Sequence, residues 1–278
     1  MDENKNLQDL KERRKPEIDW LRRMAEAVKA SKELPADQEV SGSLAMIGQA
    51  YLPERALMVV GQAPNGAMAG EWRRSDLDER FIDSVIRAFA GPSPNGHPCP
   101  MRWVTDQWCM EEARSIWRQN GWTTKPYSTA RPAFWRTLKQ VVANLNVANT
   151  DDDAWPSHLV WTNLYKINPA DGGNPEPVLC APQFDCCIKL LKTEIESYRP
   201  RRILFSTGSD WPKPFLRDLG FVPEKVQSAR GLGVKNIGSL RDAAYSAPRV
   251  VVASHPQARG TDESAWVRQV VEAFGAAQ

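Results

Sequence analysis

The stretch from Ala56 to Gly66, ALMVVGQAPNG, decides the fold of this chain. Its first half, residues 56–60, is a short apolar run with Pro53 and Glu54 before it and the turn GQAPNG after it. A short apolar run with such borders predicts a strand that is buried on both faces. Strands of this kind belong to parallel sheets with helices on both sides. Because ligands of such sheets bind just beyond the carboxyl ends of the strands, the turn is a candidate functional site.

Further apolar runs predict strands that alternate with helices. The predicted strands are residues 158–165 (HLVWTNLY), 202–206 (RILFS) and 249–253 (RVVVA). Apolar residues at helical spacing predict helices at 17–28, 71–89, 111–119, 134–145, 184–198, 211–219 and 264–274. This alternation predicts one α/β domain, a three-layer α/β/α fold with a mainly parallel central sheet.

Local signals assign the shorter segments. Residues 1–15 are charged and are expected to fray at their start, whereas residues 44–50 are expected to form a helical turn. Ser128 or Thr129 is the predicted N-cap of the helix at 134–145, because a hydroxyl can accept a hydrogen bond from a free amide of the first turn.

The composition indicates a soluble protein of the cytoplasm. The five cysteines include no CxxC pair, and the polar start MDENKNLQDLKERRK lacks the apolar segment of a signal peptide, so we expect reduced thiols. No run reaches the roughly 18 apolar residues of a membrane span. The net charge of +2 neither requires nor excludes a nucleic acid partner. We expect a monomer that binds no metal and no other cofactor.

Polar side chains follow three of the predicted strands. Gln62 and Asn65 come after the first strand, Asn163 ends the second, and His255 follows the last, held toward an extended backbone by Pro256. Because the carboxyl ends of parallel strands share one edge, we expect these side chains to converge on one pocket. The amide of Asn163 offers donors and an acceptor, enough to read the edge of a pyrimidine. The alternative is structural, with Asn163 as a turn residue and His255 as an ordinary structural histidine.

These segments resemble the motifs of the uracil-DNA glycosylase superfamily. GQAPNG (61–66) resembles motif 1, and SHPQAR (254–259) resembles motif 2, the His-Pro loop. Between them, TNLYK (162–166) resembles the strand end whose Asn reads the base, and NPEP (174–177) resembles the polar loop after it. The order of these segments matches that of the superfamily.

The chain departs from the superfamily pattern in several ways. Gln62 and Ala63 stand where well-known members place an acidic residue or Asn that orients the hydrolytic water, which leaves Asn65 as the substitute. Ile167 stands where cluster-containing members have a cysteine ligand, so no iron–sulfur cluster is expected. Residues 1–50 form an N-terminal helical extension, and the tryptophan-rich segment 67–157 is an insertion without a counterpart that could reshape the pocket for a bulkier base.

The resemblance implies a DNA glycosylase. Such an enzyme hydrolyses the N-glycosidic bond of a modified or damaged pyrimidine that has been flipped out of DNA, and a hypermodified base of phage DNA, removed in defence, is a fitting analogy. The implied catalytic residues are Asn65, His255 and Gln62. The implied substrate-binding residues are Gly61, Ala63, Pro64, Asn163, Lys166 and Ser254. The implied DNA-binding residues are Gln257, Arg259 and Asn174.

Two alternatives stay open at this point. The first is a nucleic-acid-binding protein of the same fold without catalysis, which the missing acidic residue in motif 1 favours. The second is a hydrolase of free nucleosides or nucleotides. Base release from a modified duplex separates the first from a glycosylase, and salt-dependent duplex binding argues against the second.

Overall fold

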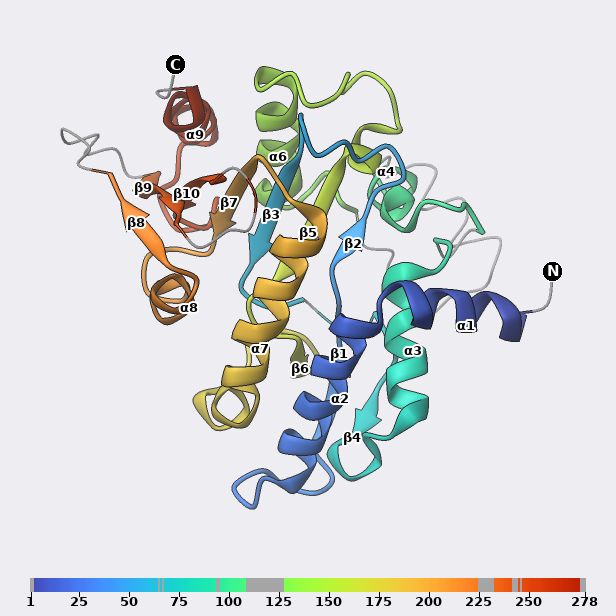
Figure 1. Ribbon diagram of the computed structural model, residues 1–278. Coiled ribbons are helices and arrows are strands. Elements are labelled where there is room, and N and C mark those ends of the chain that lie inside the picture. The colour runs from blue at the N-terminus through green and yellow to red at the C-terminus, as the bar shows by residue number, and fades with distance from the viewer. Residues whose placement is uncertain are drawn as a thin grey trace.

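A seven-stranded sheet forms the centre of the molecule in the computed structural model (Figure 1). The structure describes residues 3–64, 66, 68–93, 96–108, 128–224, 233–241, 245 and 247–275. The strand order is β2-β5-β3-β7-β10-β9-β8. Their bounds are β2 (Met46–Ile47), β3 (Leu57–Gly61), β5 (Leu159–Asn163), β7 (Arg202–Ser206), β8 (Phe221–Pro223), β9 (Val234–Leu240) and β10 (Arg249–Ala253).

The four central strands run parallel, and shorter or antiparallel strands complete the edges. β3 pairs in parallel with β5 and β7, and β7 pairs in parallel with β10. β2, β9 and β8 each pair antiparallel with their neighbours. In this register Gly61 lies opposite Asn163, so the carboxyl ends of β3 and β5 stop at the same level. The predicted strands and their parallel arrangement are confirmed.

Helices cover both faces of the sheet. In the view of Figure 1, α7 (Pro177–Tyr198) crosses in front of β3 and β5, and α6 (Ala133–Asn144) lies behind them. α2 (Lys15–Ala30) packs beside α7, and α9 (Glu263–Gly275) packs against α6 and β10. The short α8 (Lys213–Asp218) lies near β8. This is the three-layer α/β/α fold that the sequence predicts.

The remaining elements lie beside the main sheet. α1 (Glu3–Arg13) precedes α2 and contacts α3 (Glu79–Ala90), and α4 (Trp103–Asp106) follows α3. Three short strands form a separate antiparallel sheet in the order β4-β1-β6. These strands are β1 (Glu39–Gly42), β4 (Trp72–Arg73) and β6 (Ile167–Pro169). Single 3-10 turns occupy Arg74–Asp76, Pro100–Arg102 and Trp155–His158.

Apolar periodicity explains why these segments fold as they do. All five residues of β3 are buried, as expected for a strand with helices on both sides. In α3 the buried residues recur at helical spacing, and the side chain of Asp78 caps the helix by accepting a hydrogen bond from Arg80 N. In the part of the chain that the structure describes, no helix is both long and apolar enough to cross a membrane.

Several local predictions are wrong. Helix α1 already begins at Glu3 and α2 at Lys15, and the first two residues, where fraying was expected to begin, lie outside the described residues. Residues 44–50 contain β2 instead of a helical turn, because Met46 and Ile47 pair with the otherwise open edge of β5. The helix predicted at 71–89 begins only at Glu79, where Asp78 caps it.

Two further helix starts differ from the prediction. The predicted caps of α6 are not used: Pro132 precedes the helix, and the hydroxyl of Thr129 donates to Val104 O. α7 begins at Pro177 rather than at 184, since proline suits the first turn of a helix. The helix predicted at 111–119 lies outside the described residues.

Candidate active site

A cavity of about 1280 Å³ opens at the carboxyl edge of the central sheet. Residues after three parallel strands line it: Gln62 after β3, Asn163 at the end of β5, and His255 after β10. Gly61, Ala63, Asn174 and Gln257 also line the cavity. The predicted convergence of Gln62, Asn163 and His255 is therefore confirmed, whereas Asn65 lies outside the described residues.

Gln62 connects the loop after β3 to two other loops through hydrogen bonds of its side-chain amide. Its Nε2 donates to Thr207 O, 2.8 Å away, in the loop after β7. Its Oε1 accepts a hydrogen bond from Asn174 Nδ2, also at 2.8 Å. Both ends of the amide are thus occupied, and an amide has no basic lone pair for proton abstraction. Gln62 orders the site and cannot act as a general base.

Asn163 presents an unpaired amide in the cavity. The residue is 2% exposed, and its Nδ2 has no hydrogen-bond partner among the described residues. Leaving such a donor unpaired costs about 1–3 kcal/mol, so a buried free donor is a feature that a bound ligand can satisfy. Gly61 makes room for it, because a Cβ at that position would collide with Asn163 Oδ1.

His255 is held in one ring orientation and one tautomer. Its imidazole stacks on Phe134 with ring centroids 6.0 Å apart and an interplanar angle of 17°. Nδ1 accepts a hydrogen bond from Gln257 N at 3.3 Å, which places the proton of the neutral ring on Nε2. Burial lowers the pKa of His255 below its ordinary value of 6.5, so the ring is neutral at pH 7 and Nε2–H can donate.

The segment 67–157 supplies one wall of the cavity. Met68, Arg80 and Arg87 of this segment line the cavity, and so do the aromatic residues Trp103 and Trp135. Trp135 packs edge-on against Trp103, and both contact Trp161 of β5. The prediction that this segment borders the pocket is confirmed for Trp135.

Helix α6 connects the aromatic wall of the cavity to His255. Arg136 forms an ion pair with Glu263 of α9, with Arg136 Nε 3.1 Å from Glu263 Oε2, and this pair joins α6 to the helix that follows His255. Phe134, two residues earlier on α6, makes a contact with His255 that sequence reasoning missed. Its only signal was its place in the apolar stripe of a helix, which is the same for any core residue.

The family model of the uracil DNA glycosylase superfamily matches residues 49–275. The chain belongs to the uracil-DNA glycosylase superfamily. Membership gives the chain a DNA glycosylase-type function in general terms, with DNA as the partner. No curated protein matches the chain at significant similarity. The matched range includes both resembling motifs and the wall segment 67–157, and it leaves out the first 48 residues.

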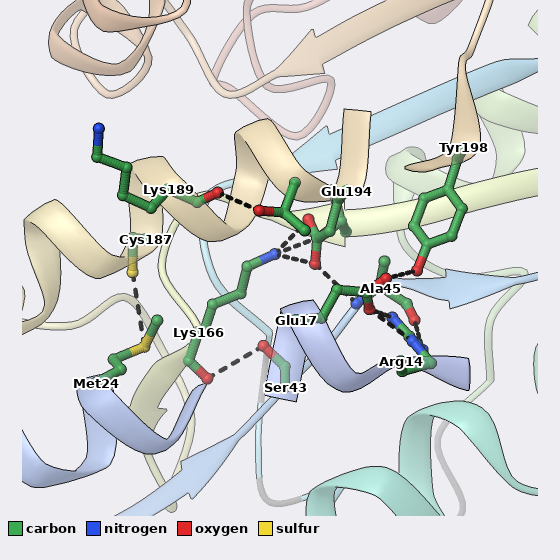
Figure 2. A network of polar contacts seen from close by, with 12 residues as sticks. Arg14, Glu17, Met24, Ser43, Ala45, Lys166, Cys187, Lys189, Glu194 and Tyr198 are labelled. Carbon is green, nitrogen blue, oxygen red and sulfur yellow. Dashed lines mark hydrogen bonds and ion pairs between the residues drawn. The ribbon is translucent and has the colours of Figure 1, made fainter. Parts of the chain in front are cut away.

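Lys166, expected from the resemblance to this superfamily to bind substrate, lies elsewhere. Its side chain is fully buried and forms an ion pair with Glu194 of α7, with Nζ and Oε2 2.8 Å apart (Figure 2). Thr162 Oγ1 donates to the same carboxylate at 2.8 Å, and Ala45 N donates to its other oxygen at 3.1 Å. Because side chains alternate along β5, Thr162 faces α7 while Trp161 and Asn163 face the cavity. Lys166 joins the α7 side and does not line the cavity.

Other residues implied by the resemblance lie outside the cavity lining. Pro64, within motif 1, is buried, and Arg259, the last residue of motif 2, is exposed. Ser254 is held through its backbone, where its carbonyl accepts from Trp266 Nε1 at 2.9 Å and its amide donates to Gly233 O at 2.7 Å. Trp72, one of the tryptophans of the segment 67–157, packs on Phe81 and is not among the residues that line the cavity. Within the described ranges, no group of three or more His, Cys, Asp or Glu residues could hold a metal ion.

Proposed function

We propose that this protein hydrolyses the N-glycosidic bond of a modified or damaged pyrimidine that has been flipped from DNA into the cavity. The observation that carries the proposal is the unpaired, buried Nδ2 of Asn163 in the same cavity as the donor Nε2–H of His255. An Asn amide can pair with the edge of a flipped base through one donor and one acceptor.

The chemistry matches the groups present. Cleavage of an N-glycosidic bond passes through an oxocarbenium-like sugar while negative charge builds on the departing base. A neutral imidazole that donates through Nε2 stabilises this charge without first giving up a proton. We assign that role to His255, the orientation of the attacking water to Asn65, and the ordering of the surrounding loops to Gln62.

The size of the cavity favours a bulky base. Sites for small ligands usually enclose about 300–1,000 Å³. The cavity here is larger, at about 1280 Å³, and its lining combines the aromatic wall with polar groups of α3, Asp83 and Ser84 among them. These features support a pyrimidine with a large polar substituent, such as the hypermodified bases of phage DNA, and hence a role in phage defence.

Exposed polar residues in the loop after β10 indicate where the DNA would lie. Gln257 and Arg259 are exposed just beyond His255, and Gln257 lines the cavity. We assign both residues to the duplex around the flipped nucleotide, and Asn174 to the same side of the site. The protein acts as a monomer in the cytoplasm, a proposal that the free cysteines among the described residues support.

The experiment that tests the proposal is a release assay. Duplexes carrying different modified pyrimidines, and genomic DNA of phages with altered cytosine, are incubated with excess protein, and freed bases and abasic sites are measured. We expect release from at least one substrate, and a loss of about 10²–10³ in rate for His255→Ala or Asn65→Ala with DNA binding retained. Salt-dependent duplex binding without release from any substrate would instead establish the non-catalytic binder, and release from free nucleosides alone would establish the nucleoside hydrolase.

A further inference from the structure

One face of helix α3 lines the cavity with polar side chains. These residues recur at helical spacing: Arg80, Asp83, Ser84 and Arg87. Because residues three and four apart are neighbours on a helix surface, the four form one continuous stripe. The apolar residues of α3 that alternate with them are buried in the core. The polar stripe is therefore part of the cavity wall rather than an ordinary solvated helix face.

The two residues at the centre of this stripe present hydrogen-bond acceptors. The side chain of Asp83 is 32% exposed, and a carboxylate only accepts hydrogen bonds. The hydroxyl of Ser84 donates its proton to the carbonyl of Ala69, so its oxygen can only accept from a ligand. A ligand group that reaches both residues must therefore supply a hydrogen-bond donor, such as a hydroxyl or an amino group.

The arginines at the two ends of the stripe do not alter this requirement. Arg80 is paired with Asp78, with Nη2 and Oδ2 3.0 Å apart, and both Arg80 and Arg87 are exposed. Water and salt weaken the attraction of such exposed cations for an anion. A carboxylate group that reached the centre of the stripe would have no proton to offer to Asp83 or Ser84.

An ion pair from the N-terminal helices holds the carboxylate of Asp83. Lys11 of α1 pairs with Asp83 Oδ1, and α1 lies beside α3 and contacts it (Figure 1). The pair engages one oxygen of the carboxylate, and the other oxygen can accept from a ligand. Lys11 precedes residues 49–275, the range that the superfamily model matches, so this contact comes from the chain's own N-terminal extension.

We propose that Asp83 and Ser84 bind a hydroxyl or amino group on the substituent of the flipped base. Lys11 is the positioning residue that fixes the Asp83 carboxylate for this contact. The inference rests on the proposed function, because Asn163, to which we assign the edge of the base, lines the same cavity as the stripe. It adds the chemical class of the substituent and gives the N-terminal helices a part in substrate choice.

The test measures binding to duplexes that resist cleavage. Each duplex carries one uridine with a 2′-fluoroarabino sugar, whose fluorine disfavours the oxocarbenium-like sugar of the cleavage step. A short alkynyl linker on the base ends in a hydroxyl, an amino, a methoxy or a carboxylate group. Dissociation constants are measured by fluorescence anisotropy. We expect wild type to bind the hydroxyl and amino duplexes about tenfold more tightly than the methoxy duplex, which lacks the donor.

Variants separate the contact with Asp83 from the general placement of α3. Asp83→Ala should bind the hydroxyl and amino duplexes no more tightly than the methoxy duplex. Lys11→Met should lose most of the preference, and Lys11→Arg should keep it. Arg22→Met is the matched control and should keep the preference. Arg22 also joins the N-terminal helices to α3, with Nε 2.6 Å from Glu79 Oε1, but Glu79 is not among the residues that line the cavity.

The outcomes distinguish this inference from the proposed function. Wild type that binds the hydroxyl, amino and methoxy duplexes alike, or prefers the carboxylate duplex, overturns the inference even if it releases bases from cleavable DNA. A preference that survives in Asp83→Ala overturns it as well. Equal losses in Lys11→Met and Arg22→Met overturn the positioning role of Lys11. A preference that depends on Asp83 in a protein that releases no base supports the inference and overturns the proposed function.

Discussion

At the residue scale, the protonation of His255 can be measured directly. Burial lowers its pKa, so the folded protein binds this proton less readily than the unfolded chain. The residue therefore lowers stability as the pH falls from 6.5 toward its folded pKa, and has no such effect above 6.5. We expect an NMR titration of the three histidines to show His255 titrating below 6.5.

The same titration tests the contact with Phe134. Phe134→Ala removes the ring that stacks on His255, so solvent reaches the imidazole and its pKa should rise toward the ordinary value. Phe89→Leu, a core change on α3, is the matched control and should leave the titration unchanged. An unaltered His255 titration in Phe134→Ala would show that other groups shield the ring.

The absence of a side chain at Gly61 is predicted to allow the present orientation of the Asn163 amide. In Gly61→Ala the new Cβ would collide with Asn163 Oδ1, so the amide must turn away from its present position. Overpacking of this kind costs about 1–3 kcal/mol of stability. We expect Gly61→Ala to reduce discrimination between bases as strongly as Asn163→Ala does, with duplex binding kept. Single-turnover release rates on duplexes that carry the preferred base or another base measure the discrimination, and gel-shift titrations measure duplex binding. A Gly61→Ala variant that discriminates between bases as wild type does would contradict the prediction.

At the element scale, the ion pair of Lys166 and Glu194 joins the end of β5 to α7. Lys166→Met leaves the carboxylate buried without its cation, which should destabilise the protein by about 3–5 kcal/mol in urea unfolding. Replacing both partners, in Lys166→Met with Glu194→Leu, should recover much of this loss, because two apolar side chains leave no uncompensated charge. If Lys166→Met alone were as stable as wild type, water would have to reach the carboxylate of Glu194.

At the scale of the whole molecule, helix α2 packs its apolar face into the hydrophobic core. Ile18, Leu21, Met24 and Val28 of α2 are almost fully buried, and α2 packs on α7. Burying each such side chain contributes about 1.5–3 kcal/mol, so together they match a typical domain's stability of about 5–15 kcal/mol. We propose that residues 1–278 form one folding unit rather than a domain with a separable extension.

Truncation tests this unit. Removal of residues 1–30 should abolish the cooperative urea transition or leave the protein insoluble, whereas removal of residues 1–5 should have little effect. Circular dichroism against urea concentration is the measurement. A truncated protein that unfolds cooperatively near the wild-type midpoint would show that the helices are an appendage.

The sequence by itself determined the central parallel strands, the main amphipathic helices and the meeting of Gln62, Asn163 and His255. These features follow from the spacing of apolar residues along the chain and from the rule that parallel strands end at one edge of the sheet. Neither depends on contacts between distant segments. The short edge strands β2 and β8, and the more polar β9 beside β8, were missed because such strands are stabilised by the neighbours that pair with them.

Only the tertiary structure decided which polar residues face the cavity. Lys166 follows Asn163 by three positions, yet its ammonium group forms a buried ion pair with Glu194, which lies far along the chain on α7. In the sequence Phe134 is indistinguishable from any other apolar residue of a helix. The packing of α6 against α9 nevertheless brings its ring into a stacked contact with the imidazole of His255. Both outcomes depend on contacts between segments that are distant in sequence, and no local pattern encodes the partner of a buried charge or a stacked ring.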